Sequence, residues 1–148
     1  MPATDHGHPM IYMDTSAAVA LLTHEPESAR VAARLAATSE PIASSEWLIT
    51  EFASALAAKQ RARLLRPAHV KAAMGAFEQW ADAGLRLLPV SRAAYLRAAQ
   101  LCGDAKTGLR AGDALHLAVA MEAKIPTLLG LDATMNAAAR KLGLAVLP

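Results

Sequence analysis

The sequence predicts a single α/β domain in which helices cover both faces of a central, mainly parallel sheet. Its 148 residues suit one domain with one hydrophobic core. A hydrophobic fraction of 54% and a net charge of only +2 exclude a disordered chain. Short apolar runs alternate with helical segments along the chain, which is the pattern of a parallel sheet joined by helical crossovers.

Each expected element begins or ends at residue types that favour that boundary. The apolar run at residues 10–13 indicates a buried strand, and Asp14, Thr15 and Ser16 follow it with side-chain oxygens suited to cap a helix. In chain order we expect strand 10–13, helices 17–22 and 26–38, strand 41–44, a helix that Ser45 caps and that ends in a basic stretch before Pro67, helix 67–83, strand 85–90, a helix from Ser91 to residue 101, a loop at 103–112, helix 113–123, strand 127–131, a helix from Asp132 to Gly143 and strand 144–147.

Composition narrows the compartment and the function class. No window of about 18 uncharged apolar residues occurs, so we expect no membrane span. The single cysteine, Cys102, excludes a disulfide framework and a multi-thiolate zinc site, so we expect a cytoplasmic protein. Only 4% of the residues are aromatic, which disfavours a base-stacking platform. We assign residues 10–148 to the domain and expect residues 1–9 to be a disordered extension, although His6 and His8 are also a possible metal pair.

Four acidic residues carry the functional prediction. Asp14 and Asp132 each follow a predicted strand and Asp113 begins a helix, so all three belong at the carboxyl edge of the sheet, where parallel sheets bind ligands. Glu51 lies inside a helix on the face that carries Trp47, where an ionised carboxylate needs a compensating cation. Clustered oxygen ligands without a histidine partner suit Mg²⁺ or Mn²⁺.

Each of these residues also has a simpler interpretation. The three aspartates stand at helix starts, where a carboxylate caps backbone N–H groups and complements the helix dipole. Glu51 could pair with Lys59 or a neighbouring arginine, or lie at the surface. Thr15 and Ser16 either hold a water or a phosphate oxygen in the site or cap the helix. His116 is either a residue of the site or a structural histidine in the core.

Four segments, in one order and spread over nearly the whole chain, carry a family resemblance: residues 11–17 (IYMDTSA), 44–56 (SSEWLITEFASAL), 112–118 (GDALHLA) and 131–144, which begins Leu-Asp and ends Leu-Gly-Leu. Together they resemble PIN-domain ribonucleases, specifically the VapC-type toxins of bacterial toxin–antitoxin pairs. Gly130 departs from that pattern, because family members often have Thr or Ser two residues before the fourth acid.

The resemblance implies a three-layer α/β/α sandwich with an acidic pocket for divalent metal. Asp14 and Asp113 would be direct ligands of Mg²⁺, with Mn²⁺ able to substitute. Glu51 would act through a water or deprotonate the nucleophile, and Asp132 would hold a second metal or its water. Hydrolysis by water would leave 5′-phosphate and 3′-hydroxyl ends. The resemblance also implies an RNA substrate, a cognate antitoxin and a homodimer. The basic residues expected to guide the RNA backbone are Lys59, Arg61, Arg63 and Arg110.

Two other functions compete with this interpretation. In a catalytically inactive interaction module of the same fold, the acids would merely cap helices, and removing Asp113 would cost stability alone. In an aspartyl-phosphate phosphatase, Asp14 would attack phosphate covalently. Such enzymes carry Asp-x-Asp at the strand end, whereas the third residue here is Ser16, so the phosphatase is disfavoured.

Overall fold

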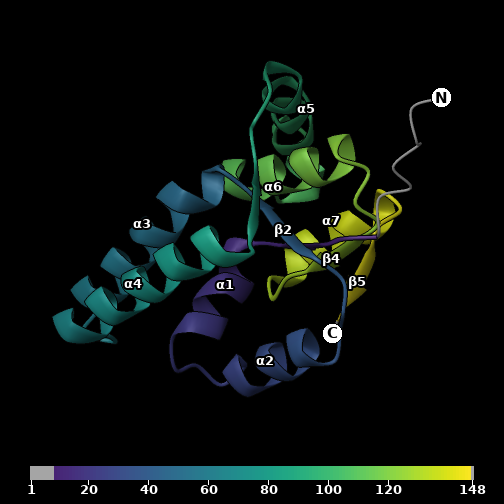
Figure 1. The fold of residues 1–148 in the computed structure, drawn as a ribbon. Coiled ribbons are helices and arrows are strands. Elements are labelled where there is room, and N and C mark those ends of the chain that lie inside the picture. Colours follow the sequence, from purple (N-terminus) through teal and green to yellow (C-terminus); the bar gives the residue numbers. More distant parts are fainter. Residues whose placement is uncertain (1–8, 148) are drawn as a thin grey trace.

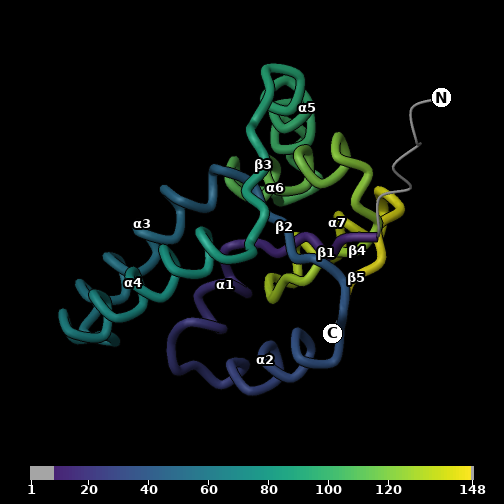
Figure 2. Tube along the Cα trace, in the orientation of Figure 1, coloured from purple at the N-terminus to yellow at the C-terminus, as the bar shows by residue number. Residues whose placement is uncertain are grey.

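Five short strands form one parallel sheet in the computed structural model, which describes residues 9–147 (Figure 1). The strands lie in the order β3-β2-β1-β4-β5, with β1 in the centre (Figure 2). Their bounds are β1 Ile11–Met13, β2 Ile42–Ser45, β3 Arg86–Leu88, β4 Thr127–Leu129 and β5 Ala145–Leu147. All four pairings are parallel, which confirms the predicted α/β class.

Helices cover both faces of this sheet and complete three layers. Side chains alternate between the faces: Tyr12 packs in one core cluster, while Ile11 and Met13 pack in the other. The helices on the Tyr12 face are α5 Arg92–Gly103, α6 Ala111–Glu122 and α7 Ala133–Lys141, and those on the opposite face are α1 Thr15–Leu22, α2 Ser28–Ala36, α3 Trp47–Arg61 and α4 Pro67–Ala83.

The strand order places a crevice beside β1. From β1 the chain builds outward through β2 to β3, then crosses back to add β4 on the other side of β1. At such a switch point the connections leave β1 and β4 on opposite faces, which opens a crevice at their carboxyl ends. Asp14 follows β1 directly, so the chain topology brings this residue to the crevice.

Several predicted boundaries differ from those of the structure. Ser45 does not cap α3, because it is the last residue of β2 and pairs with Leu88 of β3. Asp113 does not begin α6, which starts at Ala111 after the N-cap residue Arg110. The predicted loop at 103–112 contains a short 3₁₀ helix, η1, at Ala105–Thr107. Four of the five strands are also shorter than expected, and β2 keeps the expected length one position further along the chain. In contrast, α4 has the predicted bounds, from Pro67 to the residue before Gly84.

Two further expectations concern the chain as a whole. No helix among residues 9–147 is long and apolar enough to cross a membrane. The extension expected at residues 1–9 lies, apart from Pro9, outside the described residues.

Candidate active site

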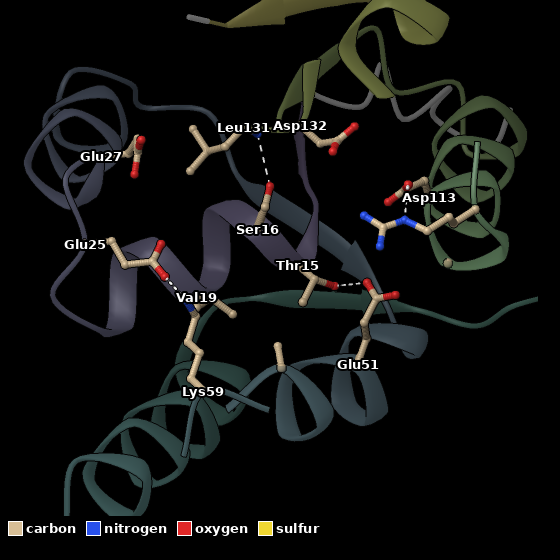
Figure 3. Close-up of a pocket in the computed structure, with 13 residues that line it drawn as sticks. Thr15, Ser16, Val19, Glu25, Glu27, Glu51, Lys59, Asp113, Leu131 and Asp132 are labelled. Carbon is tan, nitrogen blue, oxygen red and sulfur yellow. Dashed lines mark hydrogen bonds and ion pairs between the residues drawn. The ribbon is translucent and has the colours of Figure 1, made fainter. Parts of the chain in front are cut away.

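A cavity of about 580 Å³ opens where β1 and β4 end. Figure 3 shows that its walls come from α1, α3, α6 and the segment after β4, which are far apart in sequence. Three of the four predicted acids, Glu51, Asp113 and Asp132, line this cavity. The fourth, Asp14, is only 3% exposed, and the next two residues, Thr15 and Ser16, line the wall. The structure therefore brings the sequence-predicted acids to one place.

Asp14 both caps a helix and belongs to this cluster. Its Oδ1 accepts the Ala17 N–H at 3.0 Å, and the Ser16 hydroxyl donates to its carboxylate at 2.8 Å. Burial raises the pKa of Asp14 above its ordinary value, and the charge of Asp113 raises it further, against the opposing effect of His116. The capping interpretation and the site interpretation thus hold together for this residue.

Ser16 connects the ends of β1 and β4. Besides donating to Asp14, its Oγ accepts the Leu131 N–H at 3.1 Å (Figure 3). At Gly130 an added Cβ would lie 3.4 Å from the carboxyl carbon of Asp14 and 3.0 Å from Oδ1 of Asn136. The hydroxyl group beside Asp14 is therefore supplied by α1, and the glycine at position 130 leaves the space that Asn136 occupies.

Glu51 is held by three hydrogen-bond donors. Thr15 Oγ1 donates to its Oε1 (Figure 3), His116 Nε2 lies 3.0 Å from the same oxygen, and Trp47 Nε1 donates to Oε2 at 2.9 Å. Burial by itself would raise the pKa of Glu51, but the hydrogen bonds from His116, Thr15 and Trp47 outweigh burial and lower it to about 2. Glu51 is therefore ionised over the physiological range. The predicted alternative partner, Lys59, pairs with Glu25 instead.

Asp113 experiences the charges of its acidic neighbours. Burial raises its pKa, and the charges of Asp132 and Glu51 add to this effect, while Arg110 opposes it from 4.0 Å. Asp132 caps α7, where its Oδ1 accepts the Met135 N–H at 2.7 Å. Asp132 therefore makes a cap hydrogen bond, whereas Asp113, the third residue of α6, makes none and complements the dipole of the first turn.

The donor set suits a hard divalent cation, although the side chains are not already gathered around one point. Among residues 9–147, no three His, Cys, Asp or Glu side chains converge closely enough to hold a metal ion as they stand. Glu51 is turned toward its three donors and Asp14 toward Ser16. The acids contribute oxygen ligands, which Mg²⁺ and Mn²⁺ prefer. Their mutual repulsion is what a bound cation would relieve.

The predicted basic residues divide into two pairs. Lys59 and Arg110 line the cavity, whereas Arg61 and Arg63 are exposed and do not line it. Lys59 forms an ion pair with Glu25, which lies in the segment between α1 and α2 and also lines the cavity (Figure 3). The sequence contained no signal for Glu25, because this contact joins two segments that only the fold brings together.

Sequence reasoning also missed three residues that shape the surroundings of Glu51. Trp47 lies one helical turn before Glu51, so its place on that face was visible, but its role as a donor was not. Tyr12 reaches the site through His116, with its hydroxyl oxygen 2.8 Å from Nδ1. A Cβ at Gly112 would overlap Oε2 of Glu51, so the glycine in the Gly-Asp-Ala segment makes room for that carboxylate.

Comparison with known proteins identifies a family and a shared fold. The PIN domain family model matches residues 11–141. The structure of VapC20 from Mycobacterium tuberculosis, described as a sarcin-ricin loop cleaving toxin, is similar with a TM-score of 0.72 and 20% identity, over 86% of this chain and 94% of that one. VapBC2 from Rickettsia felis, bound to a DNA fragment from its promoter, has a TM-score of 0.64 and 16% identity, over 93% and 97%. FitAcB from Neisseria gonorrhoeae has a TM-score of 0.62 and 21% identity, over 94% and 97%. No curated protein sequence matches the chain.

The first prediction concerns the space at Gly112. We expect Gly112→Ala to lower the free energy of unfolding by about 1–3 kcal/mol, because the new methyl group overlaps the Glu51 carboxylate. It should also shift the indole N–H resonance of Trp47, which donates to that carboxylate. Urea unfolding and NMR measure the two effects. Gly75→Ala in α4 is the control: nothing lies near its added Cβ, and we expect it to raise stability by about 0.5–1 kcal/mol. Equal changes of stability in Gly112→Ala and Gly75→Ala would contradict the conclusion that Gly112 makes room for the Glu51 carboxylate.

The second prediction concerns the buried charge of Asp14. Because its pKa is raised in the folded protein, the free energy of unfolding falls as pH rises through that pKa. Asp14→Asn keeps an oxygen to cap α1 and removes the charge, so without metal it should be more stable than the parent by about 0.5–2 kcal/mol at neutral pH. The gain should vanish below the ordinary pKa of 3.8, where both states bind the proton. Urea unfolding of both proteins in EDTA, from below pH 3.8 to neutral pH, measures the difference in stability. An Asp14→Asn variant that is less stable than the parent at neutral pH would refute the prediction.

Proposed function

The chain belongs to the PIN domain family, and we propose that it is a metal-dependent endoribonuclease toxin, which hydrolyses RNA phosphodiester bonds and is neutralised by a cognate antitoxin. The observation that carries the proposal is the cavity at the switch point of the sheet, which Glu51, Asp113 and Asp132 line and beside which Asp14 is buried. The fold that the chain shares with VapC20, a protein described as a toxin that cleaves the sarcin-ricin loop, supports the same class of reaction.

We assign the acids distinct tasks. Asp14 and Asp113 would hold Mg²⁺ or Mn²⁺, because both are at rigid ends of elements and both have raised pKa values that a cation would lower. When bound, such an ion neutralises charge on the phosphate oxygens and lowers the pKa of a water. Glu51 orients that water rather than taking its proton, since a carboxylate whose pKa is about 2 is a weak base near neutral pH. Asp132 would complete the set from the β4 side.

The chemistry is a hydrolysis. Water attacks phosphorus and the bond from phosphorus to the 3′-oxygen breaks. The attacking water gives up a proton to solvent and the leaving 3′-oxygen takes one from solvent, so the products carry 5′-phosphate and 3′-hydroxyl ends. Thr15 holds the Glu51 carboxylate in place, and Ser16 holds that of Asp14. The acidic cavity repels RNA until its charge is reduced, so basic residues around it have to guide the phosphate backbone. Lys59 and Arg110 are the predicted basic residues that line the cavity.

The competing function, an inactive interaction module, draws support from Asp14 and Asp132, which do cap helices. It accounts less well for Asp113, which lies in the first turn of α6 and complements the helix dipole, but which makes no cap hydrogen bond and has a pKa that burial and the charges of Asp132 and Glu51 raise. The resemblance to VapC-type toxins further supports a cognate antitoxin that blocks the acidic cavity, a homodimer, and action on RNA in the cytoplasm.

The third prediction tests the reaction directly. Purified protein should cleave a labelled RNA mixture with Mg²⁺ or Mn²⁺, and the products should carry 5′-phosphate ends. Cleavage should stop when EDTA is added. Asp113→Asn should abolish cleavage while remaining folded by circular dichroism. Asp82→Asn, the same chemical change at an exposed position of α4, is the matched control and should retain full activity. Cleavage that survives both EDTA and Asp113→Asn would rule out the proposed site, and an RNA mixture left intact with every metal would favour the interaction module.

The fourth prediction concerns RNA binding in the inactive Asp113→Asn background. Lys59→Met should weaken binding and reduce the slope of log affinity against log salt by about 0.7, the value for one phosphate contact on a single strand. Glu25→Gln should strengthen binding, because it frees Lys59 from its ion pair. Lys71→Met, the same chemical change at an exposed position of α4 away from the cavity, is the control and should change neither quantity. Filter binding over a salt series measures both. An unchanged slope in Lys59→Met would show that Lys59 does not contact RNA.

A further inference from the structure

A buried row of polar side chains leads from the core to the cavity. The hydroxyl oxygen of Tyr12 lies 2.8 Å from His116 Nδ1, and His116 Nε2 lies 2.9 Å from Thr15 Oγ1 and 3.0 Å from Glu51 Oε1. Tyr12 is 0% exposed and His116 1% exposed, so water does not satisfy either ring. The two rings also meet edge to face, with centroids 5.7 Å apart and planes at 70°, which fixes the orientation of the imidazole.

With a neutral imidazole, the protons in this row have one consistent arrangement. Glu51 is ionised and can only accept hydrogen bonds, so His116 Nε2 must carry a hydrogen to be 3.0 Å from Oε1. A neutral imidazole has one N–H group, which leaves Nδ1 as an acceptor. Tyr12 then donates its hydroxyl hydrogen to Nδ1, and burial, which raises the pKa of Tyr12, keeps that hydrogen in place.

We propose that Tyr12 and His116 are a pair of positioning residues, in which the Tyr12 hydroxyl donates to Nδ1 and holds the imidazole with its Nε2–H directed at the Glu51 carboxylate in the active site. The proposal rests on the proposed function, since it gives Glu51 a task in hydrolysis. It assigns to the pair no contact with RNA. Groups that orient a site carboxylate through such contacts typically change metal affinity or activity by about 10–100-fold when removed.

Core packing alone does not explain these two residues. The core cluster around Tyr12 and His116 is built mainly of alanine, leucine, isoleucine and methionine side chains, and an apolar residue would fill either position without a polar group to satisfy. A buried hydroxyl and a buried imidazole cost free energy unless each finds a partner. Here the Tyr12 hydroxyl and His116 Nδ1 are each other's partners, and His116 Nε2 faces Glu51 and Thr15.

Two substitutions of His116 separate positioning from packing. The amide nitrogen of Gln reaches the place of Nε2, whereas that of Asn reaches only the place of Nδ1. We expect His116→Asn to lower kcat by about 10–100-fold and to weaken Mn²⁺ binding, because the charge of Glu51 is no longer held beside the ion. His116→Gln should restore most of both. RNA cleavage and calorimetry with Mn²⁺ alone measure these quantities, and thermal unfolding measures the stability of each variant. If both variants lose stability while kcat and Mn²⁺ affinity stay equal to those of the parent, the residue is structural and the proposal is wrong.

The position of the proton gives a readout that needs neither RNA nor metal. Nitrogen-15 NMR of the imidazole should show the Nε2–H form in the parent protein. In Tyr12→Phe the Nδ1 resonance should shift, because that nitrogen loses its donor, while Nε2 keeps the hydrogen that Glu51 accepts. A parent ring protonated on Nδ1, or on both nitrogens, would overturn the proposal, because Tyr12 would then not donate to it. If the NMR and Mn²⁺ results agree with expectation while the parent protein cleaves no RNA, the proposed function fails and the positioning of Glu51 stands.

Discussion

The buried carboxylate of Asp14 is the constraint on which the site depends. It stands at the end of the central strand, where neighbouring strands and helices exclude water, and burial raises its pKa. The fold tolerates this charge because the Ala17 N–H and the Ser16 hydroxyl donate to it. Folding alone would be served as well by an uncharged cap. A charge kept at a place where it costs stability is typical of a binding or catalytic site.

Two kinds of surroundings divide the acids. Glu51 has three donors, so its pKa falls to about 2. Burial raises the pKa values of Asp14 and Asp113, and acidic neighbours add to the effect: Asp113 for Asp14, and Asp132 and Glu51 for Asp113. Carboxylates whose pKa values are pushed in opposite directions take different tasks within one site. The lowered group is suited to orient a water without binding its proton. The raised groups gain most from a divalent cation, because the cation removes the repulsion between them.

The sequence predicted the parallel sheet and the acids at its edge, because strand and helix periods and the residues after each strand are local signals. Local signals mislead where a tertiary contact extends an element: pairing with Leu88 keeps Ser45 in β2. Contacts between segments that are distant in sequence could not be predicted for the same reason. Tyr12 and His116 are 104 positions apart, and no spacing in the chain indicates their hydrogen bond. The site was therefore predictable as a set of acids, and its donors were not.

Gly130 shows how the fold supplies a group that the sequence lacks at one position. Two residues before Asp132 this chain has no hydroxyl group, but Ser16 provides a hydroxyl to Asp14 and accepts the Leu131 N–H from the β4 side. Asn136 donates to the Gly130 carbonyl at 2.9 Å, in space that a Cβ at 130 would crowd. Asp132 is independently anchored, because its Oδ1 caps α7 while the residue lines the cavity. Its place in the acidic set therefore does not depend on a hydroxyl at position 130.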